Sequence, residues 1–83
     1  MTTASYTIRD DDRYTVVVGW EDVLETFFAR VVGRYRTSGE PIFAVGTRRH
    51  EIPAVSLLAE MVSGYASIDA ATVSALRRLA PVA

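Results

Sequence analysis

The chain has 83 residues, of which 49% are hydrophobic and 23% are charged, and it contains no cysteine. A chain of this length is expected to form one domain with a thin core, and without cysteine it has neither disulfides nor thiolate metal sites. Its formal net charge of −1 provides no overall field that would attract nucleic acid or an acidic membrane. All nine basic residues are arginine, which GC-rich coding explains more simply than selection for guanidinium contacts.

Alternating apolar and polar residues in the first half of the chain predict β-strands. The strongest signal covers residues 26–36, where Phe27, Ala29 and Val31 share one face and arginines lie on the other. A slip of one residue would bury those arginines, so the core-facing side of the strand is well specified. We expect strands over residues 5–9, 13–20, 26–36 and 42–49, and the segment 5–9 decides between three and four strands.

The turns between these strands suggest how they pair. A four-residue hairpin loop after Trp20 would pair Val16 with Ala29. The turn rich in glycine and proline that follows residue 36 would then pair Gly33 with Val45. The strand over residues 26–36 therefore becomes central, with a neighbour on each side.

From residue 53 onward the apolar residues recur at helical spacing. We expect helices over residues 53–64 and 69–79, with Gly64 as a C-cap and either Ser67 or Asp69 as an N-cap. The predicted fold class is α+β: an antiparallel meander of three to four strands, then a C-terminal helical hairpin packed on one sheet face. The element order is β-β-β-α-α or β-β-β-β-α-α, in one domain over residues 1–83.

Residue types that carry catalysis are sparse. His50 is the one histidine, and the arginines beside it would repel a metal cation. The scattered glycines match neither a phosphate-binding loop nor a dinucleotide fingerprint, and no serine lies in a nucleophile elbow. We therefore expect no enzyme, cofactor or metal site. The N-terminal residues lack the features of a signal peptide, and no apolar run is long enough to span a membrane, so we expect a cytoplasmic bacterial or phage protein.

The outward face of the sheet is the first candidate site. One interpretation is a solvated surface, and the other is a docking surface, because several apolar residues and arginines share it. The predicted register sets Arg30 opposite Arg48, which is unfavourable for like charges. The candidate binding residues on this face are Val17, Phe28, Arg30, Val32, Arg34, Arg36 and Arg48.

The tip of the first predicted hairpin is the second candidate site. Val23 and Leu24 are apolar residues in a connecting loop. They would either fold back onto the helices, which is the commoner outcome, or project toward a partner.

These features predict a small non-enzymatic interaction module that binds a protein partner, as an accessory factor, inhibitor or adaptor of the kind carried by phages and plasmids. The partner would be a different protein or a second copy of the chain, because aromatic residues and arginine are enriched at protein interfaces. The alternative is a nucleic-acid-binding regulator that uses the arginine-bearing face and stacks bases on Phe28. The low net charge and the aliphatic Val17 and Val32 make this alternative weaker.

Overall fold

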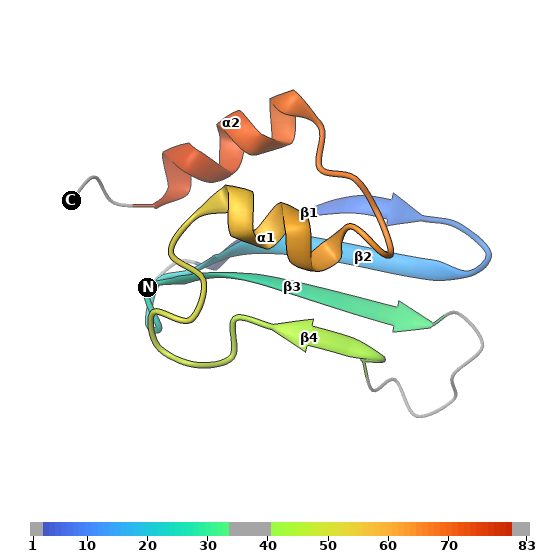
Figure 1. The fold of residues 1–83 in the computed structure, drawn as a ribbon, viewed down its shortest axis with the longest axis horizontal. Coiled ribbons are helices and arrows are strands. Elements are labelled where there is room, and N and C mark those ends of the chain that lie inside the picture. Colours follow the sequence, from blue (N-terminus) through green and yellow to red (C-terminus); the bar gives the residue numbers. More distant parts are fainter. Residues whose placement is uncertain (1–2, 34–40, 81–83) are drawn as a thin grey trace.

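Four antiparallel strands form one sheet in chain order, and two helices follow them (Figure 1). The structure, a computed structural model, describes residues 3–33 and 41–80. The predicted α+β fold class is confirmed. The elements are β1 Thr3–Asp10, β2 Tyr14–Glu21, β3 Thr26–Gly33, β4 Phe43–Val45, α1 Val55–Val62 and α2 Ala70–Leu79.

Both helices lie on the same side of the sheet, with α1 chiefly on β3 and α2 chiefly on β2 (Figure 1). The core lies between the two layers, and the rings of Trp20 and Phe27 meet there edge to face at 4.9 Å. Alternate residues of β2 and β3 supply the sheet side of this core, as the period-2 pattern predicts. The buried core cluster comprises Val18, Trp20, Phe27, Ala29, Ile52, Val55, Leu58, Val62 and Leu76.

The strand registers differ from those predicted. Val16 pairs with Val31 rather than with Ala29, two residues away, and Val45 pairs with Ala29 rather than with Gly33, four residues away. Both displacements are even numbers of residues, so every strand residue keeps its predicted face. The first hairpin loop still has four residues but comprises 22–25, because Glu21 pairs with Thr26.

The predicted strand over residues 42–49 is too long. β4 ends at Val45 because Gly46 takes a positive φ of 79° and turns the chain out of the sheet. Arg48 therefore lies in the loop after β4, and Ala44, not Arg48, is opposite Arg30. β3 is described as far as Gly33, and the predicted site residues Arg34 and Arg36 lie outside the described residues.

Both helices begin later than predicted, and α1 also ends earlier, with Ser63 rather than Gly64 as its C-cap. α1 begins at Val55 after an N-cap residue, Ala54, whose side chain forms no capping hydrogen bond. Of the two caps predicted for α2, Ser67 and Asp69, the structure has Asp69, which accepts a hydrogen bond from the Thr72 amide at 2.7 Å. No described helix is long and apolar enough to cross a membrane.

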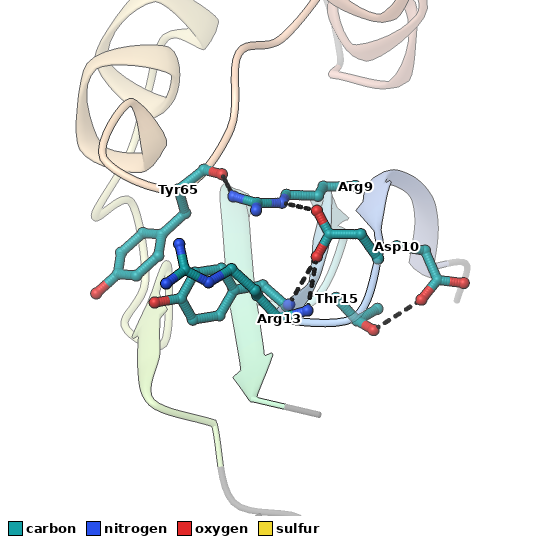
Figure 2. A network of polar contacts seen from close by, with 7 residues as sticks. Arg9, Asp10, Arg13, Thr15 and Tyr65 are labelled. Atoms are coloured by element: carbon teal, nitrogen blue, oxygen red, sulfur yellow. Dashed lines mark hydrogen bonds and ion pairs between the residues drawn. The ribbon is translucent and has the colours of Figure 1, made fainter. Parts of the chain in front are cut away.

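A polar network fastens the β1–β2 hairpin to the segment after α1 (Figure 2). Arg9 donates to Asp11 at 2.6 Å and to the Tyr65 carbonyl, also at 2.6 Å. Its guanidinium lies 5.0 Å from the centre of the Tyr14 ring. Asp11 also accepts from the Arg13 and Tyr14 amides, and these backbone hydrogen bonds, with the Arg9 contact, lower its pKa to about 2. The acidic turn is therefore a structural link between the layers.

Candidate functional site

The second face of the sheet carries no layer among the described residues, because both helices occupy the other side. A row of paired residues crosses this open face from β1 to β4: Thr7, Val17, Arg30 and Ala44. Val17 and Phe28 are half-buried, whereas Arg30 and Ala44 are exposed. The predicted outward orientation of Val17, Phe28, Arg30 and Val32 agrees with the observed pairing.

Phe28 is held flat against the sheet by two glycines. It pairs across the strands with Gly19, and a Cβ atom added to Gly19 would lie 2.8 Å from the Phe28 ring. A Cβ atom on Gly46 would lie 2.7 Å from the Phe28 Cβ. The aromatic side chain therefore covers backbone that has no side chain of its own. It forms an apolar floor rather than a ring that stands away from the surface.

A shallow depression of about 320 Å³ lies beside Phe28 and brings the two candidate sites together. Leu24 from the hairpin tip lines it, as do Arg30 and Ala44 from the open face. Leu24 is half-buried there, and Val23 next to it is 50% exposed. The hairpin tip thus extends the open sheet face. Its remaining lining residues are Glu21, Phe28, Ala29, Val45, Gly46 and Thr47.

The loop that forms one wall of the depression is shaped by Glu51. The Glu51 carboxylate accepts hydrogen bonds from the backbone amides of Gly46, Thr47 and Arg48, each at 3.2 Å. A side chain therefore satisfies amides that would otherwise continue the strand ladder. This local bonding explains why β4 ends early and why Arg48 does not join the row on the sheet.

The end of the same loop is fastened to the beginning of β3. The buried Thr26 hydroxyl accepts a hydrogen bond from the Ile52 amide at 2.8 Å, and the Phe27 amide donates to the Ile52 carbonyl at 3.1 Å. Thr26 is fully buried although it lies on the outward side of its strand. The loop therefore covers this end of the open face and delimits the depression.

A charged corner lies next to the hairpin tip. Glu25 contacts Arg49 and His50 at 3.1 Å each, and the His50 amide donates to the Leu24 carbonyl at 3.0 Å. The hydrogen bond from His50, followed by the charge of Arg49, lowers the pKa of Glu25. Glu25 and His50 have positive φ angles of 51° and 57°, so two left-handed residues meet at this corner. Its side chains are largely exposed, and they orient the tip without forming an enclosed reaction site.

The charged side chains around the depression differ in whether they already have a partner. Arg30 is exposed and forms no hydrogen bond or ion pair with any residue that the structure describes. Arg49 is already engaged by Glu25, and Glu21 and Asp22 lie at the hairpin end. Arg30 is therefore an available cation beside an apolar floor. Within residues 3–33 and 41–80, no three His, Cys, Asp or Glu side chains gather in a way that could hold a metal ion.

Only part of this site was predictable from the sequence. Leu24, Phe28 and Arg30 come together, Val17 and Val32 lie farther along the same face, and Arg48 stands apart in the loop. Glu51 and Thr26, which shape the wall of the depression, were not singled out. A glycine followed five residues later by a glutamate was the available signal, but that spacing is common.

Comparison with known protein families, curated proteins and solved structures finds no match to this chain. A function must therefore be inferred from the chain's own surface.

Proposed function

We propose that this chain is a small non-enzymatic cytoplasmic module that binds another protein through the open face of its sheet. The docking surface comprises Leu24, Phe28, Arg30 and Ala44. The partner presents an apolar side chain to the depression and a carboxylate to Arg30. Accessory factors, inhibitors and adaptors are proteins that act in this way.

The observation that carries the proposal is the exposed Arg30, which bonds to no residue that the structure describes, beside the apolar floor formed by Phe28. Interfaces combine apolar contact with arginine, whose planar guanidinium binds carboxylates in a bidentate manner. The Phe28 ring already lies half-buried over Gly19, so less side-chain freedom is lost when a partner covers it. A rigid apolar surface with one available cation therefore favours an acidic and apolar protein segment.

Several features make a nucleic acid a poorer occupant of the same surface. Base stacking requires an aromatic face to which a base has access, but Phe28 is half-buried across Gly19. Arg49 is paired with Glu25, and further acidic residues stand at the hairpin end. Among the described residues that line the depression, Arg30 is the one cation, so the salt-dependent phosphate attraction there would be small.

The test compares wild-type chain with two variants of the surface and one matched control in affinity capture from the native host. Arg30→Glu reverses the available charge, and Ala44→Glu sets a carboxylate of the chain's own opposite Arg30. Arg77→Glu makes the same charge reversal at an exposed position of α2, on the other side of the sheet. All three substitutions should leave the fold intact, because each substituted residue is exposed.

We expect a protein that wild type and Arg77→Glu capture and that Arg30→Glu and Ala44→Glu lose. With that protein purified, calorimetry should show the dissociation constant raised about tenfold or more by each surface variant. Equal capture by all four chains would refute the assignment of the surface. Capture abolished by nuclease, with oligonucleotide binding that depends on Arg30, would favour the nucleic-acid regulator instead.

A further inference from the structure

β1 leaves one long edge of the sheet without a neighbouring strand. The sheet order is β1-β2-β3-β4, so among the described residues β1 pairs along one side only (Figure 1). The two helices pack chiefly on β3 and β2, and the end of α2 approaches β1 on its helix side, at Ala4. The opposite edge is far shorter, because β4 has three residues and ends at the turn of Gly46. β1 has eight residues and is the more available edge.

The sequence of β1 offers little protection against pairing. Edge strands usually avoid association through charged side chains, proline or bulges. In β1, residues 3–8 carry neither charge nor proline, and the charges Arg9 and Asp10 come only at its end. The bulge is also near that end, where the pairing with β2 shifts between Thr7 and Arg9. A regular ladder over residues 3–7 is therefore left open on one side.

We propose that two copies of this chain pair through β1, antiparallel, so that their sheets join into one eight-stranded sheet about a two-fold axis. Such an axis is perpendicular to the sheet and keeps the helices of both copies on the same side. Each residue must then pair with one that faces the same side. Ser5 faces outward with Gly19, and Tyr6 faces the helices with Val18. Ser5 therefore pairs with Ser5, Tyr6 with Tyr6 or Thr7 with Thr7 on the axis.

The register centred on Ser5 is the one that uses the whole regular ladder. It sets Ala4 opposite Tyr6 on the helix side and pairs the backbone of residue 3 with that of Thr7. No like charges oppose each other, because the paired residues are uncharged. The net charge of −1 on each copy adds little repulsion.

Tyr6 supplies a second observation in favour of this partner. It is one of the exposed large hydrophobic side chains, with 36% of its surface accessible, and it lies at the free edge. In the proposed pair each Tyr6 lies opposite a small residue, Ala4 of the second copy, which leaves room for the ring. A large side chain opposite a small one, repeated by the two-fold axis, makes the edge complementary to itself.

The experiment measures mass by sedimentation velocity over a range of protein concentrations. Wild type should reach the mass of two 9.1 kDa chains. Ser5→Lys and Ser5→Glu each bring two like charges together at the axis, and each should raise the dimer dissociation constant about tenfold or more. An equimolar mixture of the two variants should restore a dimer, because the axis then joins opposite charges. Ser74→Lys, at an exposed position of α2, is the matched control and should dimerise as wild type does.

Three results would overturn the proposal. Wild type could remain a monomer at every concentration. Both Ser5 variants could dimerise as tightly as wild type, with the Ser5 amide exchanging its hydrogen equally fast in dilute and concentrated protein. Alternatively, Arg30→Glu could abolish the dimer while the Ser5 variants still dimerise. The dimer interface would then lie on the open face of the sheet and not at β1. Loss of the dimer in the Ser5 variants with capture through Arg30 unchanged would separate the two surfaces.

Discussion

Replacing Gly19 by alanine should destabilise the fold strongly, because two strands and one ring converge on this position. The added Cβ would lie 2.2 Å from the Ala4 carbonyl oxygen of β1 and 2.8 Å from the Phe28 ring. Carbon and oxygen atoms of adjacent strands approach no closer than about 3.3 Å. β1 would therefore have to move away by roughly 1 Å, which strains the β1–β2 ladder.

Overpacking of this kind costs about 1–3 kcal/mol, and we expect the upper part of that range because the nearest atom is backbone. Denaturation in urea measures the loss, and the single tryptophan, Trp20, is buried in the core and reports unfolding. Gly64→Ala is the matched control, since nothing lies within 4 Å of its added Cβ. We expect Gly64→Ala to stay within about 1 kcal/mol of wild type.

A double variant separates the two contacts at Gly19. Phe28→Leu removes the ring contact but leaves the Ala4 carbonyl in place, so Gly19→Ala/Phe28→Leu should recover only a small part of the loss. If the free energy of unfolding of Gly19→Ala lies within about 0.5 kcal/mol of the wild-type value, β1 does not approach Gly19 as closely as the 2.2 Å distance requires. The close packing of Phe28 over Gly19, on which the docking surface depends, would then be refuted as well.

Three further predictions concern the links between the layers. Thr26→Val should cost about 1–3 kcal/mol in urea denaturation, because the Ile52 amide loses its buried acceptor, whereas Thr26→Ser keeps the hydroxyl and most of the stability. The pKa of Asp11 is lowered to about 2, so its contribution to stability is complete above its unfolded value near 3.8 and is lost as the pH falls through about 2. The stability difference between wild type and Asp11→Asn should therefore be constant near neutral pH and shrink on acidification; a constant difference down to the lowest pH would contradict the lowered pKa. Leu76→Ala should cost about 2–5 kcal/mol, because Leu76 is the fully buried residue of α2, and unchanged hydrogen exchange across α2 would argue against its packing.

Local sequence patterns predicted some features of the candidate site but not others. The period-2 pattern predicted that Phe28 and Arg30 face outward, and this survived two incorrect registers, because both were wrong by even numbers of residues. The meeting of Leu24 with Phe28 did not follow from the pattern. Leu24 lies in a hairpin loop whose next residue, Glu25, has a φ of 51°, a conformation that is uncommon for a residue with a side chain and that the pattern does not predict.

Amino-acid composition and periodicity by themselves determined the α+β class, the order of strands before helices, and the two faces of β2 and β3, and they limited the cap of α2 to Ser67 or Asp69. These depend on near neighbours in the chain and on which side of an element is apolar. Only the tertiary structure decided the registers, the length of β4 and the walls of the depression. Those depend on contacts between distant residues, such as Thr26 with Ile52, and on backbone angles, such as that of Gly46, that many sequences allow.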